Sequence, residues 1–333
     1  MDCNPIKKIL VIIVSRIGDS MLTTPAIRSI AHFYKDAEIT ILAHPKRHLI
    51  FKNLPFVDNL DVITKNTALY RSRFGKKKYD LAFVYGYDKS LIQYALRSSR
   101  KVVAFKQKEN KINNMLYKAV DFPNSEIVHF VDIFMALPRS IGIHEDSKRL
   151  SIALTSDEII FAEKTLNSKE LNNKLLIGIQ AVSFPTKDFR DWPIKCFLDL
   201  CQQISHEDPN VHFLIYGGPS PEEKIKLDML FNGLRKNATN FIGMSLRETA
   251  ALMSKTNLYI GVDTGPTHIM STFNIPMIVL FHCKLKSKIY GALEHPYYFP
   301  IDHPNSDNCS EKSPMSDILV KTVLKEVNKA LIA

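Results

Sequence analysis

The stretch LYIGVDTGPTHIM, residues 258–270, carries the strongest fold signal in the chain. Its first five residues are apolar and favour a buried strand, and Pro266 is suited to the first position of a helix. The turn between them, around Gly265, leaves backbone N–H groups open to an anion. A capped helix start without a ligand would explain the same pattern, but the density of polar groups favours a ligand. The side chains available to it are those of Asp263, Thr264, Thr267 and His268.

Strand and helix patterns alternate on both sides of this stretch, which predicts an α/β protein with two doubly wound parallel sheets. The polar segment 167–174 is the predicted linker, so we expect domains at 1–166 and 167–333, facing each other across a cleft. Strands are predicted at 8–14, 37–43, 59–63, 79–85, 101–105, 175–179, 211–216, 241, 258–262 and 277–281. Helices are predicted at 19–34, 44–54, 89–97, 156–166, 193–205, 221–234, 246–254, 267–273 and 316–331.

The length of 333 residues agrees with two domains. No apolar run reaches the ~18 residues of a membrane-spanning helix, and the apolar residues 9–14 are followed by Arg16 and Asp19 rather than by a signal-peptide cleavage site. We therefore expect a cytoplasmic protein. The cysteines have no Cys-x-x-Cys or zinc-type spacing and are expected to be free thiols; they are Cys3, Cys196, Cys201, Cys283 and Cys309.

The positive charge is concentrated in the first half of the chain. Residues 1–150 hold 25 Lys and Arg against 14 Asp and Glu, a net charge of +11, whereas the remainder carries −1. This asymmetry predicts an anionic partner for the first half: nucleic acid, an acidic membrane surface, or a phosphorylated or carboxylated substrate. The densest basic run, which is either a solvated loop or the surface that binds the acceptor, comprises Arg71, Arg73, Lys76, Lys77 and Lys78.

Two further motifs follow predicted strands. Gly18-Asp19 comes after the first strand, where Asp19 is either a general base for an acceptor hydroxyl or a helix N-cap. Residues 186–193 hold Lys187 and Arg190, cations suited to a phosphate, although a solvated loop whose Trp192 covers the core edge is the alternative. Acidic residues after Gly217-Gly218 either reach a nucleotide ribose or are the acidic start of a helix after a turn. The chain has no Asp-x-Asp or His-Glu-x-x-His metal motif.

Taken together, these motifs resemble those of the ADP-heptose:lipopolysaccharide heptosyltransferases, glycosyltransferase family 9. The segment 16–28 is similar to the opening motif of the family, 185–193 to its middle motif, and 261–268 to its donor-site motif; 79–81 and 244–248 also match, in the same order. The chain departs from the pattern after residue 281, where a Gly-Pro-Thr-like turn is replaced by His282-Cys283-Lys284-Leu285-Lys286-Ser287-Lys288.

The resemblance implies a GT-B fold and inverting, metal-independent transfer from ADP-heptose to the inner core of lipopolysaccharide or lipooligosaccharide, without a cofactor. It implies an enzyme on the cytoplasmic face of the inner membrane in transient contact with the bilayer, with a monomer as the default expectation. Asp19 falls on the general-base position and Arg190 on that of a phosphate-contacting lysine. The implied donor contacts are Gly18, Thr186, Lys187, Glu222 (or Glu223), Met244, Asp263, Thr264, Gly265, Thr267 and His268.

Rival interpretations stay open from the sequence alone. The same fold could use another nucleotide sugar or acceptor. A nucleotide-sugar epimerase would have a similar two-domain architecture but would turn over the donor without an acceptor. A nucleic-acid-binding protein would explain the basic half but not the residues from 261 to 268.

Overall fold

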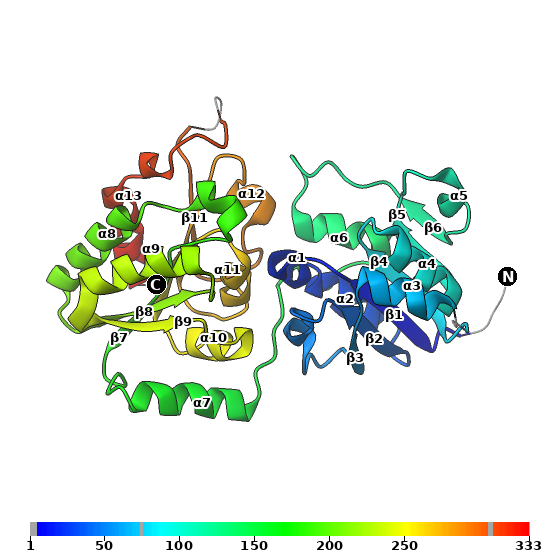
Figure 1. Ribbon diagram of the computed structural model, residues 1–333, viewed down its shortest axis with the longest axis horizontal. Coiled ribbons are helices and arrows are strands. Elements are labelled where there is room, and N and C mark those ends of the chain that lie inside the picture. The colour runs from blue at the N-terminus through cyan, green and yellow to red at the C-terminus, as the bar shows by residue number, and fades with distance from the viewer. Residues whose placement is uncertain (1–4, 74–75, 306–308, 333) are drawn as a thin grey trace. The chain divides into compact units, whose positions relative to one another are not determined.

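The computed structural model describes residues 5–73, 76–305 and 309–332. The chain divides into two compact units, Met1–Ala153 and Leu154–Ala333, which are coloured blue to green and green to red in Figure 1. The predicted linker, residues 167–174, lies within the second unit in this division, and the assignment of acceptor and donor to the two parts of the chain remains a prediction. Within the described residues, no helix is both long enough and apolar enough to cross a bilayer.

The first unit contains one parallel sheet of six strands in the order β3-β2-β1-β4-β5-β6. The strands are β1 (Lys8–Ile13), β2 (Glu38–Ala43), β3 (Asn59–Val62), β4 (Tyr79–Tyr85), β5 (Ser99–Phe105) and β6 (Lys118–Val120). The helical segments are α1 (Ile17–Leu22), α2 (Thr24–Phe33), η1 (His48–Phe51), α3 (Lys65–Arg73), α4 (Lys89–Ser98), α5 (Asn110–Asn113) and α6 (Phe130–Arg139).

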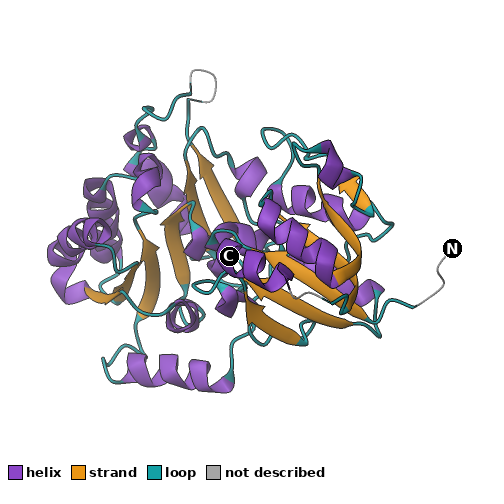
Figure 2. Ribbon diagram, turned by 45° about the vertical axis from the view of Figure 1, so that its right-hand side comes forward, coloured by secondary structure: helices purple, strands orange, loops and turns teal. Residues whose placement is uncertain are grey.

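The second unit has the strand order β12-β11-β10-β7-β8-β9. Numbered from one within the unit and read from the opposite edge, this is 3-2-1-4-5-6, the same order as in the first unit. Its strands are β7 (Leu175–Gln180), β8 (Val211–Gly217), β9 (Ala238–Ile242), β10 (Leu258–Val262), β11 (Met277–Phe281) and β12 (Tyr298–Asp302). Its helical segments are α7 (Ser156–Asn167), η2 (Pro185–Arg190), α8 (Ile194–Glu207), α9 (Pro221–Leu234), η3 (Arg235–Asn237), α10 (Leu246–Met253), α11 (Gly265–Met270), α12 (Ser287–Tyr290), η4 (Met315–Asp317) and α13 (Val320–Ala330). Helices and strands are distinguished by colour in Figure 2.

Most residues of the central strands are apolar and buried, because both faces of each sheet are covered. All five residues of β10 and of β11 are buried. Trp192, the single tryptophan, is fully buried in the core of the second unit and donates its Nε1–H to the carbonyl of Ile318. Trp192 is therefore a core residue, whereas the role of Lys187 and Arg190 in the same segment stays a prediction.

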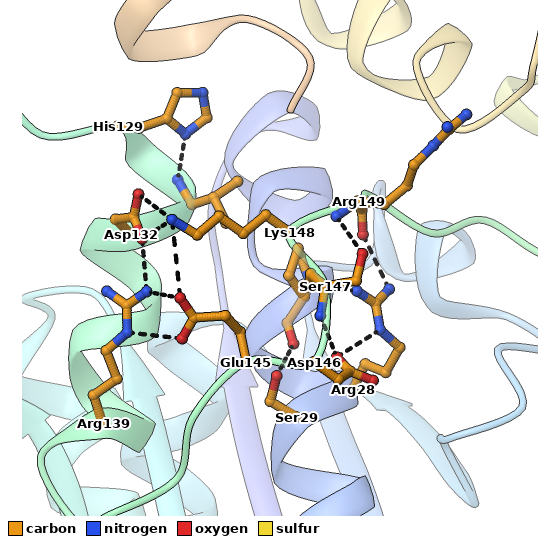
Figure 3. Close-up of polar contacts among 12 residues, drawn as sticks. Arg28, Ser29, His129, Asp132, Arg139, Glu145, Asp146, Ser147, Lys148 and Arg149 are labelled. Carbon is orange, nitrogen blue, oxygen red and sulfur yellow. Dashed lines mark hydrogen bonds and ion pairs between the residues drawn. The ribbon is translucent and has the colours of Figure 1, made fainter. Parts of the chain in front are cut away.

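The last residues of the first unit are fixed by ion pairs to α2 and α6 (Figure 3). Arg28 donates to the carbonyls of Ser147 and Arg149 at 2.7 and 3.0 Å and forms an ion pair with Asp146. Beside it, charged groups of Asp132, Arg139, Glu145 and Lys148 form a second network, in which Arg139 bonds both carboxylates. These contacts hold residues 145–149 against α2 and α6.

Several elements were not predicted, for identifiable reasons. Helix α3 has almost no apolar stripe, since only Ala68 and Ser72 are buried. Strand β12 contains Pro300, which a parallel sheet tolerates there because β12 is an edge strand. The predicted helix 19–34 is interrupted at Thr23 into α1 and α2.

The expectation of free thiols is wrong for two cysteines. Cys283 and Cys309 form a disulfide across a sequence separation of 26, whereas Cys196 and Cys201 are free. Cys283 follows β11 and Cys309 lies after β12; because these parallel strands are neighbours, the chain leaves the same sheet edge twice. Spacing in the sequence could not reveal this proximity. Cys3 lies outside the described residues.

Candidate functional site

Each sheet has one place where its strand order reverses, between β1 and β4 in the first unit and between β7 and β10 in the second. In doubly wound sheets, ligands bind beyond the carboxyl ends of the strands at this point. Asp19 follows β1, while Arg190 and Asp263 follow β7 and β10. The three motifs that the sequence singled out for chemistry therefore lie at the two switch points, one in the first unit and two in the second.

In the second unit, Arg190 and Asp263 bridge the switch point. One guanidinium nitrogen, Nη1 of Arg190, donates to both the Oδ2 and the backbone carbonyl of Asp263, each at 3.2 Å. The Asp263 side chain is 4% exposed and that of Arg190 is 19% exposed. Nε of Arg190 and Oε1 of Gln180, the last residue of β7, are buried without a hydrogen-bond partner in the part of the chain that the structure describes. Unpaired buried polar atoms are rare, and a missing ligand is one explanation.

Phe189, which was not predicted from the sequence as a site residue, lies beside the two cationic side chains of the segment 185–190. The ring of Phe189 lies 5.5 Å from the ammonium of Lys187 and 5.9 Å from the guanidinium carbon of Arg190. Its other neighbour is His282, whose ring centroid is 4.9 Å away in an edge-on arrangement. Cations over an aromatic face are attracted by its quadrupole, so Phe189 supports both positive groups at the carboxyl end of β7.

The residues of the donor-like loop divide into supporting and available groups. The hydroxyl of Thr267 donates to the carbonyl of Val262 at 2.7 Å and shares a hydrogen bond with the hydroxyl of Tyr259, so it is committed to the fold. His268 is buried, with Nε2 3.6 Å from Oδ1 of Asp263. Thr264 is the N-cap of α11 but its side chain makes no capping hydrogen bond, and with Gly265 it is partly exposed at the strand end.

The loops after β8 and β9 carry the remaining donor candidates. Glu223 accepts a hydrogen bond from the N–H of Gly218 at 2.7 Å, and burial raises the pKa of its carboxyl group. Glu222 is exposed at the start of α9, and Met244 is partly buried against the core after β9. Of the two glutamates, Glu222 is thus the one whose carboxylate faces solvent. Thr186 is exposed within η2.

In the first unit, Asp19 lies in the first turn of α1, while Arg16 holds the N-cap position and Gly18 is inside the helix. The N-cap interpretation of Asp19 is therefore wrong. Arg47, from the loop after β2, donates to the carbonyl of Ser15 at 2.9 Å, and the charges of Arg16 and Asp19 both act on its pKa, which burial lowers. Arg16, Asp19 and Arg47 thus form a mixed-charge cluster that was not identified from the sequence, and the charge of Arg47 also acts on His44.

An aromatic group lies beyond the carboxyl ends of β4 and β5. The rings of Tyr87, Phe105 and Phe122 contact one another with centroid separations of 5.0 to 6.1 Å. Tyr87 is 52% exposed and Phe122 39% exposed, and burial of its ring raises the pKa of Tyr87 to about 12. Exposed rings at this carboxyl edge, one strand away from the switch point, offer a flat apolar surface to a ligand.

The basic run lies at the other edge of this sheet. Helix α3 runs from the carboxyl end of β3 back toward the start of β4. Lys76, Lys77 and Lys78 immediately precede Tyr79, the first residue of β4, and therefore lie at the amino-terminal edge of the sheet. Tyr79 is six residues before Tyr85, which pairs with Ile13 near the carboxyl end of β1. At ~3.3 Å per strand residue, the basic run is roughly 20 Å from the edge that carries Asp19. The structure does not bring these candidates together.

The turn after β11 brings His282, Cys283 and Cys309 close enough for their ligand atoms to lie within 4.8 Å of one another. Both sulfurs are joined in the disulfide. Nδ1 of His282 accepts from the N–H of Lys284, and Nε2 lies 3.1 Å from the carbonyl of Ser313. As arranged, these groups brace the turn and leave no ligand atom for a metal ion.

Comparison with known proteins places this geometry in context. A family model described as glycosyltransferase family 9 (heptosyltransferase) matches residues 90–296, more than half of the chain. The lipopolysaccharide core heptosyltransferase OpsX of Haemophilus influenzae is 22% identical, and the match covers 87% of this chain and 83% of OpsX.

Two solved structures resemble this chain over nearly the full length of both chains. A family 9 glycosyl transferase from Veillonella parvula has a TM-score of 0.84 and 19% identity, with 100% of this chain and 99% of the other covered. The ADP-heptose lipopolysaccharide heptosyltransferase II of E. coli has a TM-score of 0.79 and 18% identity, with 98% of each chain covered. The predicted GT-B fold class is confirmed.

Proposed function

The chain belongs to glycosyltransferase family 9, the heptosyltransferase family, and from this membership we propose that it transfers a heptose from ADP-heptose to the inner core of lipopolysaccharide or lipooligosaccharide. The observation that carries the proposal is the Arg190–Asp263 pair at the switch point of the second sheet. It supplies a fixed cation with an unpaired buried Nε–H where a nucleotide diphosphate would bind.

In the proposed reaction, the acceptor hydroxyl oxygen attacks the anomeric carbon while the bond from that carbon to the diphosphate oxygen breaks. Asp19 takes the hydroxyl proton, and ADP leaves with its electron pair. Attack opposite to the leaving group inverts the anomeric centre. A positioned base typically contributes about 10²–10⁴-fold in rate.

The departing diphosphate develops negative charge that Arg190 and Lys187 would stabilise from their positions on the Phe189 ring. Thr186, Thr264 and Gly265 are partly or fully exposed near the same strand ends and would add donors. Asp263 and His268 would act mainly by holding Arg190 in place, and Thr267 by supporting the loop. No metal ion is needed in this scheme, because protein cations neutralise the leaving group.

The nucleoside end of the donor would lie over β8 and β9. There Glu222 would accept from a ribose hydroxyl and Met244 would pack on the adenine. In the first unit, Arg16 and Arg47 would attract the acidic groups of the acceptor near Asp19, and the rings of Tyr87 and Phe122 would support its sugars.

A panel of nucleotide sugars offered with truncated core acceptors, with products read by mass spectrometry, tests the proposal. We expect a mass increase of one heptose only when ADP-heptose and a heptose-deficient acceptor are both present. Donor turnover without acceptor would identify an epimerase, and transfer of another sugar would refute the donor assignment. Asp19→Asn is the matched variant, since it should still bind the donor and fail to transfer.

We further propose that the protein works at the cytoplasmic face of the inner membrane, touching the bilayer transiently, because its lipid-linked acceptor is presented there. The net charge of +11 on residues 1–150 supports attraction to an acidic surface. Such attraction would weaken as salt is added.

A further inference from the structure

The unit that carries Asp19 has a second charged surface, at the edge of its sheet opposite to Asp19. Arg73, Lys76, Lys77 and Lys78 are all exposed there. Among the described residues, no carboxylate forms an ion pair with any of the four. Residues 65–78 contain six Lys and Arg and no Asp or Glu. We call Arg73, Lys76, Lys77 and Lys78, with Leu69 and Tyr70, the α3 surface.

A pocket of about 400 Å³ opens on this surface. Its cationic walls come from Arg71, Lys76 and Lys78. Asp61 contributes a carboxylate, Leu42 an apolar side chain, and hydroxyl-bearing residues line the remainder. Arg71 is paired with Asp61 at 3.4 Å, so the two lysines are the cations not engaged by a carboxylate among the described residues. Lysine ammonium and phenol hydroxyl groups together are donors suited to a phosphate. The hydroxyl-bearing residues are Thr40, Tyr70, Tyr79, Tyr94 and Ser98.

Apolar side chains stand beside these cations. On the outer face of α3, Leu69 is 51% exposed and Tyr70 is 66% exposed. Leu69 is four residues before Arg73 and therefore adjacent to it on the helix surface. Cations next to exposed aliphatic and aromatic residues suit a bilayer interface, where the head groups are anionic and the layer beneath is apolar. The charged phosphodiester backbone of a nucleic acid offers no apolar group for Leu69 to contact.

We propose that the α3 surface docks the protein on a membrane by binding the phosphates of anionic lipid head groups, with one phosphate in the pocket at Lys76 and Lys78 and with Leu69 and Tyr70 in the interface. The inference rests on the proposed function for its purpose, since that function requires a lipid-linked acceptor. The site is distinct from the transfer site, because about six strand residues, roughly 20 Å, separate the two sheet edges.

Co-sedimentation of the full chain with phosphatidylcholine vesicles, with and without phosphatidylglycerol, tests the docking surface. Each basic residue near an acidic bilayer strengthens binding by about 1 kcal/mol, which is on the order of fivefold. We expect the triple variant Lys76→Glu, Lys77→Glu and Lys78→Glu to lower binding to the acidic vesicles at least about tenfold. The matched control, Lys236→Glu, Lys321→Glu and Lys325→Glu, changes exposed lysines of the other unit by the same charge and should retain binding within about twofold.

A second variant addresses the apolar part. Replacing Leu69 and Tyr70 by Ser should weaken the binding that survives at high salt, with the melting temperature of the protein confirming that it is folded. Equal losses of vesicle binding in the Lys76, Lys77 and Lys78 variant and in its control would overturn the proposal. So would binding of inorganic phosphate or duplex DNA that depends on these three lysines, if vesicle binding did not depend on them.

The wild-type rate on a water-soluble acceptor separates this proposal from the proposed function. Transfer without any vesicle binding would reject the docking surface alone. Vesicle binding that depends on Lys76, Lys77 and Lys78, without transfer of heptose, would reject the proposed function and leave the surface in place.

Discussion

Replacing Arg190 by Ala removes the cation at the switch point of the second sheet and leaves the Asp263 carboxylate buried. Both side chains are well below one-third exposed. Removing one partner of a buried charged pair costs about 3–5 kcal/mol, and we take about 3 kcal/mol here because Asp263 also lies near His268. At about 2–4 °C per kcal/mol for a domain of this size, the melting temperature should fall by roughly 6–12 °C.

The catalytic loss should be larger than this stability loss can explain. Removing one fixed donor that stabilises developing charge typically lowers kcat by about 10²–10³-fold, or about 2.7–4 kcal/mol. Assays well below the melting temperature of the variant keep it folded, so the remaining loss reports on the reaction. Arg190→Lys should restore part of kcat, since the charge is kept and only the planar fork is lost.

Arg247→Ala is the matched control for Arg190→Ala. Arg247 is also a buried arginine of the second unit, paired with both oxygens of Glu158 at 2.8 and 2.5 Å. Its loss should lower the melting temperature comparably but leave kcat of the folded protein within about threefold. If folded Arg190→Ala turned over as fast as Arg247→Ala, Arg190 would be a structural residue and the leaving-group assignment would be wrong.

Further predictions concern other parts of the two sites. Asp19→Asn should lower kcat by about 10²–10⁴-fold with unchanged ADP affinity by calorimetry, and near-normal turnover would reject the base. Phe189→Leu should raise KM for the donor severalfold by removing the ring beneath two cations, and an unchanged KM would mean that the ring does not position them. Cys283→Ser with Cys309→Ser should lower the free energy of unfolding by about 3.5 kcal/mol from loop entropy, measured by urea titration, and equal stability would indicate that the bond is not formed in solution. His282 has its pKa lowered by burial, so between that value and 6.5 the unfolded chain binds more protons than the folded one. Stability should thus be complete above about pH 6.5 and fall as the pH drops below it, and His282→Gln should flatten this slope in denaturation curves; an identical slope would exclude His282 as its source.

The sequence was sufficient for those parts of the fold that local pattern determines. Buried strands such as 258–262 and 277–281 are continuous apolar runs, and their predicted bounds agree with the structure. Helix α3 was missed because its cationic sequence has no apolar period, and β12 because Pro300 argues against a strand unless the edge position is known. The disulfide depends on two strands being neighbours, which periodicity does not state.

In the candidate site too, residues that a local pattern marks were predicted, and residues that only spatial proximity marks were missed. Asp19, Arg190 and Asp263 were accessible from the sequence because each directly follows a strand, and strand ends share one sheet edge. Phe189 and Arg47 were not, because an aromatic residue in a loop and a cation after the second strand look ordinary until their distances to other groups are known. The basic run was noticed for its charge, and its position directly before the predicted strand 79–85 already implied the amino-terminal edge of the sheet; the structure adds helix α3, which leads into it.

The repetition of one strand order in two units bears on how such an enzyme diversifies. Each buried cluster among the described residues is confined to a single unit, so the strand-end loops of each sheet rest on a core of their own. The loops that would meet the acceptor and those that would meet the nucleotide are thereby separate heritable modules. In a protein of this architecture, mutations in the loops of one unit could change the acceptor that is bound. The loops of the other unit, which would bind the nucleotide sugar, would stay unchanged.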